Sequence, residues 1–261
     1  MTVPPLSETV SYPDLAGKVA VVTGGSRGIG AATARALAAN GAAVAVVGRD
    51  QTALAEVTAA INSAGGRAIG VGADCTDEGE LASLHQRVAD DLGPVDILVP
   101  FAGGEGMPVP TGSETGEHWR RVVDADLTST FLTISTFLPD LTTPRSGVVV
   151  TMSSAAARQA ARSSAAYAAA KAGVVALTRH LAGEFSGQGL RINCVAPSAI
   201  ENDRMRSAMP PAGLAQLGAS FPLGRIGQPT DVAAATLFLA SQVSSWITGA
   251  TLDISGGKVM L

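Results

Sequence analysis

The sequence predicts an α/β protein with a single-domain Rossmann fold, in which a doubly wound parallel sheet of about seven strands is flanked by helices. Two observations carry this prediction. Short apolar runs alternate with helix-forming stretches along the chain, and a glycine-rich turn joins the first run to the first helix. The 261 residues suffice for one such domain with a substantial core, and no repeat or linker divides them.

The expected strands share short, apolar, β-branched sequences, as strands buried on both faces should. They cover residues 19–23, 43–47, 68–72, 96–101, 147–152, 190–195 and 250–254. Helices are expected near residues 29–39, 51–64, 77–91, 117–138, 164–186 and 229–240. This alternation implies parallel strands with helices on both faces, and ligands of such sheets bind at the carboxyl ends of the strands.

Two segments fall outside the alternation. Residues 1–14 contain Pro4, Pro5 and Pro13 and are expected to form a loose arm before the domain over residues 15–261. The arm lacks the basic patch and apolar segment of a secretory signal. Residues 201–227 are expected to be a substrate-loop excursion that can close over a ligand, with a plain surface loop as the alternative.

Composition limits the partners. A net charge of −4, with 15% charged and 46% hydrophobic residues, leaves no electrostatic footprint for nucleic acid or a membrane surface. No apolar run approaches the roughly 20 residues that cross a bilayer. We expect a cytoplasmic protein with a small-molecule substrate, in which Cys75 and Cys194 are reduced thiols. The three histidines lack ligand spacing, so we expect no metal.

The glycine turn after residues 19–22 has the spacing Gly24-x-x-x-Gly28-x-Gly30 and opens a strong helix former. Ser26, Arg27 and Ile29 fill the positions between. Exposed N–H groups and the helix dipole favour a phosphate at such a helix start. A tight turn without a ligand is the alternative, but the strand–turn–helix context favours nucleotide binding.

Tyr167 and Lys171 lie four residues apart in an alanine-rich helical stretch, which places both side chains on one helix face. An ammonium beside a phenol stabilises phenolate and makes the tyrosine a usable acid. Such a proton donor suits the reduction of a carbonyl. Taken alone the spacing arises by chance on many helices.

The glycine turn, the Tyr167–Lys171 pair and Ser154, thirteen residues before Tyr167, together resemble the short-chain dehydrogenase/reductase family, in particular its 3-oxoacyl-carrier-protein reductase branch. The resemblance implies that Ser154 hydrogen-bonds the substrate oxygen, that Tyr167 passes the proton and that Lys171 holds the ribose hydroxyls. Ser153 better fits a cap or turn role. Further cofactor contacts are implied for Asp74, Cys75, Ala102, Gly103, Pro197, Ile200 and Asn202. Relatives commonly assemble, so a homotetramer or homodimer is expected.

The position after the second strand bears on the cofactor. An NAD-specific enzyme usually has a carboxylate there, but this chain has Gly48. Arg27 and Arg49 can make bidentate contacts with a 2′-phosphate. We therefore favour NADP(H), with NAD(H) as the alternative. Asp50 would repel that phosphate if it turned inward, and is expected instead to cap the helix beginning near Gln51.

Two departures from the family pattern are notable. Pro100 and Phe101 replace polar residues after the fourth strand, where proline should end the strand and phenylalanine adds bulk near the cofactor. Asp126 replaces the asparagine that completes a catalytic tetrad and, if ionised, would partly cancel the field of Lys171.

These observations favour an NADP(H)-dependent oxidoreductase acting on a carbonyl or secondary alcohol, free or carrier-bound, with Tyr167 as proton donor or acceptor. The alternative is a nucleotide-binding regulatory or scaffolding protein with little turnover. The substrate should lie against residues 104–110, 155–162 and 201–227. Within these, Arg158 and Arg162 are expected to be solvated surface charges, with contacts to an acidic substrate or carrier as the alternative.

Overall fold

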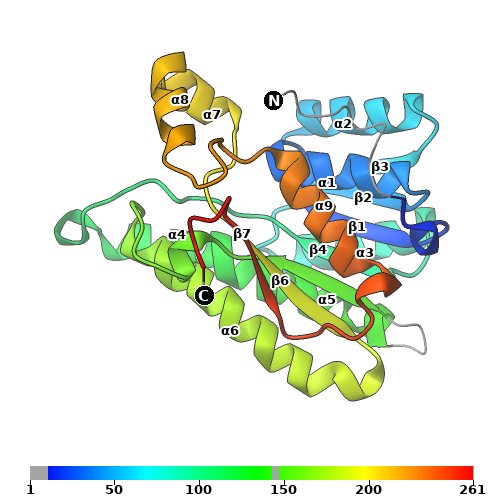
Figure 1. The fold of residues 1–261 in the computed structure, drawn as a ribbon. Coiled ribbons are helices and arrows are strands. Elements are labelled where there is room, and N and C mark those ends of the chain that lie inside the picture. The colour runs from blue at the N-terminus through cyan, green and yellow to red at the C-terminus, as the bar shows by residue number, and fades with distance from the viewer. Residues whose placement is uncertain (1–10, 143–146, 261) are drawn as a thin grey trace.

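One parallel sheet organises the chain (Figure 1). The computed structural model describes residues 11–142 and 147–260. The strands are β1 (Val19–Thr23), β2 (Ala43–Gly48), β3 (Arg67–Gly72), β4 (Ile97–Pro100), β5 (Val148–Met152), β6 (Arg191–Pro197) and β7 (Thr251–Ile254). Their order is β3-β2-β1-β4-β5-β6-β7, all paired in parallel. The order reverses between β1 and β4, which makes this the topological switch point.

Helices cover both faces of the sheet, as the sequence predicts. The longer ones are α1 (Gly28–Ala39), α2 (Gln51–Ser63), α3 (Glu78–Asp91), α5 (Ser129–Thr142), α6 (Ala165–Phe185) and α9 (Pro229–Ala240). Ala20 and Val22 of β1 pack into the core formed with α1, α2 and α9. Val19 and Val21 point the other way, into the core formed with α3, α5 and α6. Because both faces of β1 are buried, its sequence is apolar up to its last residue, Thr23.

The helix expected over residues 117–138 is instead three segments. α4 (Gly116–Val123) is followed by a π turn (Asp124–Thr128), and α5 then continues to Thr142. A π turn inserts an extra residue into a helix and is common at functional sites. Here it carries Asp126, which is fully buried.

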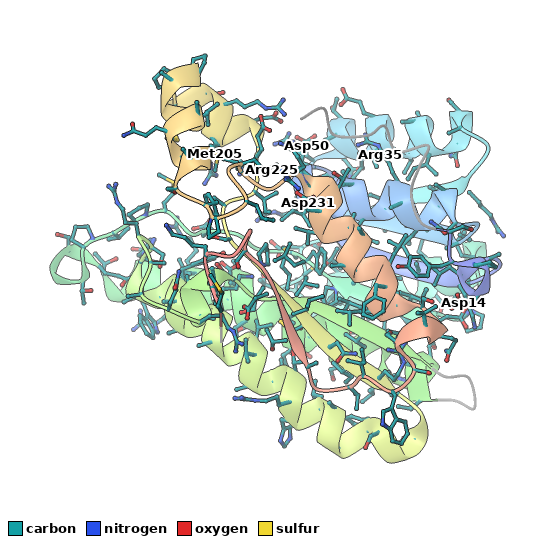
Figure 2. The ribbon with its side chains drawn as sticks, in the orientation of Figure 1. Asp14, Arg35, Asp50, Met205, Arg225 and Asp231 are labelled. Atoms are coloured by element: carbon teal, nitrogen blue, oxygen red, sulfur yellow. The ribbon has the colours of Figure 1, made fainter. Side chains whose placement is uncertain are left out.

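The excursion over residues 201–227 also contains regular structure, which the sequence prediction missed. It holds α7 (Asp203–Ala208) and α8 (Pro211–Ala219), and its base is closed by a bridge between Ile200 and Gly227. An asparagine cap begins α7, and a proline, which suits the first position of a helix, begins α8. The excursion is tied to α9 by the ion pair between Arg225 and Asp231 (Figure 2).

The described end of the expected arm is bonded to the domain. The Tyr12 N–H donates to Asn40 Oδ1 at 2.8 Å, and the Asp14 carboxylate accepts hydrogen bonds from Ser241 and Gln242. Residues 1–10 of the arm lie outside the described residues. Over the described part of the chain, no helix combines the length and apolar character needed to cross a membrane.

Candidate active site

A cavity of about 1270 Å³ lies at the carboxyl ends of β1, β2 and β4, next to the switch point. The expected cofactor-binding residues that line it are Gly24, Ser26, Arg27, Gly28, Ile29, Gly30, Arg49, Asp74, Cys75, Ala102, Gly103, Ile200 and Asn202. Pro197, Tyr167 and Lys171 do not border it. The expected residues that line the cavity come from five separate stretches of the sequence, and the cavity also borders residues of α4, the π turn and α9.

The glycine turn leaves space that no larger residue could give. Gly24 has φ +63°, and a Cβ there would lie 2.6 Å from the Phe101 carbonyl oxygen. A Cβ on Gly30 would lie 2.2 Å from the Gly24 oxygen. The N-cap residue Arg27 provides no side-chain cap to α1, so the first N–H groups of that helix are available to an anion. This cradle fits the pyrophosphate of a dinucleotide.

The edge of the cavity at β2 carries the groups expected to read the ribose. A Cβ on Gly48 would lie 3.2 Å from Ser26 Oγ, so a larger side chain would crowd the turn. The Arg27 guanidinium bonds the Asp50 carboxylate, and Arg49 Nη1 lies 3.6 Å from Asp74 Oδ2. Each arginine is thus beside a carboxylate, which the sequence prediction did not anticipate. The predicted cap is confirmed, because Asp50 Oδ1 accepts from the Ala53 N–H at 3.0 Å.

Asp74 is held in an ionised, oriented state. Its Oδ1 accepts from the N–H and the hydroxyl of Thr76 at 2.9 and 2.8 Å. These two hydrogen bonds, with the nearby Arg49 charge, hold the pKa of Asp74 below its ordinary value. Its neighbour Cys75 is buried, and burial raises the pKa of that thiol, so it serves as a packing residue.

The unusual pair after the fourth strand fits the fold. Pro100 is the last residue of β4, as expected, and the Ala102 N–H that follows donates to Thr23 Oγ1 at 3.0 Å. Phe101 borders the cavity but is only 3% exposed and packs in the core with α1 and α9. Most of the Phe101 side chain therefore packs in the core and does not fill the cavity.

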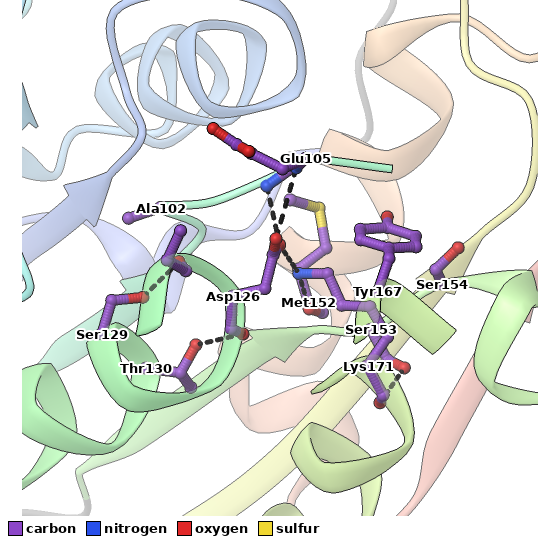
Figure 3. Close-up of polar contacts among 12 residues, drawn as sticks. Ala102, Glu105, Asp126, Ser129, Thr130, Met152, Ser153, Ser154, Tyr167 and Lys171 are labelled. Carbon is purple, nitrogen blue, oxygen red and sulfur yellow. Dashed lines mark hydrogen bonds and ion pairs between the residues drawn. The ribbon is translucent and has the colours of Figure 1, made fainter. Parts of the chain in front are cut away.

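The four expected catalytic residues lie together beside this cavity (Figure 3). Ser154 is the second residue after β5, which ends at Met152, and Asp126 comes from the π turn. Tyr167 and Lys171 project from the first turns of α6, with Lys171 Nζ 5.8 Å from the centre of the tyrosine ring. The Ser154 and Tyr167 hydroxyls point to the same side in Figure 3.

The structure corrects the expectation of which adjacent serine caps the turn. Ser154, not Ser153, is the cap: its Oγ accepts from the Ala156 N–H at 3.2 Å and begins a short 3-10 helix. Its own O–H donates to none of the residues that the structure describes. Ser153 is buried and donates to the Lys171 carbonyl oxygen at 2.7 Å. Successive residues leaving a strand face opposite sides, so one serine meets α6 and the other faces outward.

Asp126 and Lys171 form a buried ion pair, with 2.9 Å between Oδ1 and Nζ. Burial acts to lower the pKa of Lys171, but the neighbouring Asp126 carboxylate and Tyr167 outweigh it and raise that pKa. Lys171 is therefore an ammonium, and it also donates to the Met152 carbonyl oxygen at 3.1 Å. Sequence placed Asp126 near Lys171 but did not show that the contact is direct.

Asp126 has a second role that the sequence analysis missed. Its Oδ1 accepts from the Gly104 N–H at 2.7 Å, and its Oδ2 accepts from the Glu105 N–H at 3.2 Å. Gly103, at φ +118°, allows the chain to turn around the carboxylate, since a Cβ there would lie 2.5 Å from Oδ1. The consecutive glycines 103 and 104 were the available sequence signal.

Three other residues have surroundings that the sequence did not predict. Pro197 ends β6 and does not reach the cavity. Asn202 uses its side chain within the protein, where Oδ1 caps α7 by accepting from the Met205 N–H at 2.8 Å. Arg158 is not a solvated charge, because it makes a bidentate ion pair with Asp253 at 3.2 Å.

Comparison with known proteins places these features in a family. The family profile described as enoyl-(acyl carrier protein) reductase matches residues 24–258. The cis-4-hydroxycyclohexanecarboxylate dehydrogenase of Sinomonas cyclohexanicum is 40% identical, covering 92% of this chain and 96% of its own. The 3-oxoacyl-acyl-carrier-protein reductase of Chlamydia pneumoniae is 37% identical, covering 93% and 97%.

A solved structure agrees over nearly the same span. The NADPH-bound short-chain oxidoreductase of Pseudomonas aeruginosa PAO1, described as containing an atypical catalytic centre, has a TM-score of 0.89 at 35% identity. The match covers 95% of this chain and 99% of that protein. A 3-oxoacyl-acyl-carrier-protein reductase with bound NAD from Brucella melitensis has a TM-score of 0.88 at 32% identity, covering 100% and 98%. With the parallel sheet, the glycine cradle and the Ser154–Tyr167–Lys171 group, these matches show that the chain belongs to the short-chain dehydrogenase/reductase family of oxidoreductases.

Proposed function

We propose that this protein is an NADP(H)-dependent oxidoreductase that interconverts a carbonyl and a secondary alcohol, with Tyr167 as the proton donor and acceptor. One observation carries the proposal: Tyr167 lies against the buried, charged Lys171, near a Ser154 hydroxyl whose proton has no acceptor among the described residues. These are the groups that a forming alkoxide needs. The alternative is a regulatory protein with little turnover. It has less support, because Ser154, Tyr167 and Lys171 are all present.

In reduction, the Ser154 O–H donates a hydrogen bond to the carbonyl oxygen and orients it. Tyr167 transfers its proton to that oxygen as negative charge develops, and the Lys171 ammonium stabilises the resulting phenolate. The nicotinamide, when bound, supplies the hydride in reduction and accepts it in oxidation. In oxidation Tyr167 acts as the base, so the same residues serve both directions.

The preference for NADP(H) is supported by the edge at β2. Gly48 leaves no carboxylate at the position that would oppose a 2′-phosphate, and Ser26, Arg27 and Arg49 surround that space. Both arginines are well exposed, at 68% and 81%, so each can turn from its carboxylate to a phosphate. The charges of Asp50 and Asp74 attract the same two arginines and would repel a 2′-phosphate, so NAD(H) remains the alternative cofactor.

The substrate is proposed to be a small ketone or secondary alcohol, free or carrier-bound. The relatives described above are named for a cyclic hydroxy acid and for 3-oxoacyl carriers, which share this functional group. The segment after Gly104 borders the space beside Tyr167, because a Cβ on Gly106 would lie 3.1 Å from the tyrosine ring, and the excursion is proposed to close over that space. Met107 is 56% exposed and offers adaptable apolar surface there.

We also propose that the protein works in the cytoplasm as a homotetramer or homodimer. β7 is an edge strand, and an open edge is commonly covered by another chain. Leu252 on that strand is 39% exposed, and Trp246 just before it is 99% exposed. Sedimentation at several protein concentrations tests this assembly.

A panel of ketones and the matching alcohols, assayed with NADPH and NADH in parallel, tests the main proposal. The panel should include cyclic ketones with and without a carboxylate and a 3-oxoacyl thioester. We expect turnover with NADPH on at least one member. Tight NADPH binding without turnover across the panel would instead favour the regulatory alternative.

A further inference from the structure

The segment from Gly104 to Glu114 is bonded at both ends to the parts of the fold that hold Tyr167. At its start, the Gly104 and Glu105 N–H groups donate to Asp126, the partner of Lys171. Two residues on, the chain passes over the tyrosine, since a Cβ on Gly106 would lie 3.1 Å from the Tyr167 ring. The segment therefore lies against the proposed proton donor itself.

Glu114 makes the bond at the other end. Its side chain is only 5% exposed, which is unusual for a carboxylate and costly unless the charge is paired. The Ala166 N–H donates to both of its oxygens, at 3.3 and 3.4 Å. His118 Nδ1, from α4, lies 3.0 Å from Oε1. Glu114 thus joins the segment, α4 and the start of α6.

The bond falls on the turn that presents Tyr167. Ser164 caps α6 and accepts from the Tyr167 N–H at 3.1 Å, while Glu114 accepts from the preceding N–H, that of Ala166. Two consecutive N–H groups of the first turn are therefore held, one by a local cap and one by a distant carboxylate. A negative charge at a helix start is also favoured by the helix dipole.

We propose that Glu114, oriented by His118, is a positioning residue that fixes the first turn of α6 and so holds Tyr167 between Lys171 and the substrate. This inference rests on the proposed function of Tyr167. Glu114 does not touch the reacting atoms, and it acts through the Ala166 N–H. Proton transfer requires close alignment, so small displacements of the phenol slow it strongly.

The chain offers a matched control on the same helix. His180 and Glu184 are also a carboxylate–imidazole pair four residues apart, with 3.4 Å between Nε2 and Oε2. Their side chains are 74% and 51% exposed, far from the first turn. Removing Glu184 deletes the same chemistry from α6 without touching the Tyr167 end.

The test compares Glu114→Leu, Glu114→Gln and Glu184→Leu. We expect Glu114→Leu to lower kcat by about 10- to 100-fold while the Kd for NADPH stays unchanged. Glu114→Gln keeps an oxygen for the Ala166 N–H and should restore most of kcat. His118→Gln, which leaves the carboxylate in place, should give a smaller loss and serves if Glu114→Leu does not fold. Glu184→Leu should match the wild type.

A second readout does not depend on turnover. The chain has two tyrosines, so fluorotyrosine in a Tyr12→Phe background gives a fluorine NMR signal from Tyr167 alone. We expect one sharp signal in that background and in Glu114→Gln, and a broadened or divided signal in Glu114→Leu. Unchanged kcat and unchanged signals in the Glu114 and His118 variants would overturn the inference. A wild type without turnover would count against the proposed function, and the fluorine signals would still decide the role of Glu114.

Discussion

Asp126 and Lys171 form an ion pair that is closed to water, with side chains 0% and 2% exposed. Both charges have further partners, since the carboxylate also accepts hydrogen bonds from two N–H groups and the ammonium also donates to a carbonyl oxygen. Removing one partner of such a pair leaves a buried charge uncompensated, at a cost of about 3–5 kcal/mol. The ammonium that serves Tyr167 is thus shared with a permanent counter-ion.

Asp126→Asn should shift the pH dependence of alcohol oxidation. The amide removes the counter-ion, so the Lys171 ammonium acts on Tyr167 without opposition and favours the phenolate that oxidation needs. We expect the alkaline rise of kcat/KM to move to lower pH, measured with a fixed alcohol and NADP. Asp90→Asn, on the exposed face of α3, is the control and should leave the profile in place. An unshifted profile in Asp126→Asn would show that the carboxylate does not weaken the field of Lys171.

Tyr167→Phe should remove turnover and spare the cofactor. Phenylalanine keeps the ring that packs against Gly106 but has no proton to give. We expect kcat to fall by about 10²- to 10⁴-fold, the usual worth of a positioned acid. The Kd for NADPH, measured by fluorescence titration, should change little. Retained turnover in this variant would exclude Tyr167 as the proton donor.

Local sequence signals predicted the sheet and the glycine turn after β1 well. β1, β2, β4 and β5 are largely buried, mostly apolar runs, so their own composition identifies them, and the spacing of Gly24, Gly28 and Gly30 marks the turn between β1 and α1. The cap at Asp50 was likewise local. The helix cap and the strand–turn–helix pattern depend on neighbouring residues, although the carbonyl group that excludes a side chain at Gly24 belongs to Phe101.

The remaining features depend on contacts between distant segments. Asp126, in the π turn, accepts hydrogen bonds from the N–H groups of Gly104 and Glu105, which lie about twenty residues earlier in the chain. Helix periodicity therefore did not reveal the π turn. Ser153 and Ser154 face opposite sides after β5. Only Ser153 faces α6, where it donates to the Lys171 carbonyl oxygen, so Ser154 is the residue that caps the turn. The ion pairs of the arginines were equally hard to predict, because an exposed arginine can pair with any of several nearby carboxylates.

Arg49→Ala should weaken NADPH far more than NADH. We expect Arg49 to contact the 2′-phosphate, the group that distinguishes the two cofactors, and a bidentate contact of this kind contributes about 1.5–3 kcal/mol, or roughly 10- to 150-fold in Kd. Isothermal titration with both cofactors measures the ratio. Arg35→Ala, on the outer side of α1, is the control. Equal losses for both cofactors would mean that Arg49 does not read the phosphate.

Gly30→Ala should damage the cradle while leaving the chain folded. The new Cβ would lie 2.2 Å from the Gly24 carbonyl oxygen, so the turn must move. Overpacking of this kind costs about 1–3 kcal/mol of stability, and we expect a lower Tm together with weaker NADPH binding. Gly183→Ala is the matched control, because a Cβ there meets nothing within 4 Å and α6 gains a better helix former. Normal NADPH binding in Gly30→Ala would show that the pyrophosphate does not rest on this turn.

The Arg225–Asp231 pair should make the attachment of the excursion sensitive to acid. Burial acts to raise the pKa of Asp231, but hydrogen bonds from the Arg225 guanidinium and the Gln228 N–H outweigh it and hold that pKa below its ordinary value. A lowered carboxyl pKa stabilises the fold above the ordinary value of about 4 and loses that contribution as the pH falls further. Arg225 is 46% exposed, so the contribution is at most about 1 kcal/mol. We expect Arg225→Gln to be less stable than wild type near neutral pH and to approach it below about pH 4, as measured by urea unfolding. Arg87→Gln, which removes an exposed pair on α3, should show no such convergence, and a pH-independent difference for Arg225→Gln would mean that the ion pair is not its source.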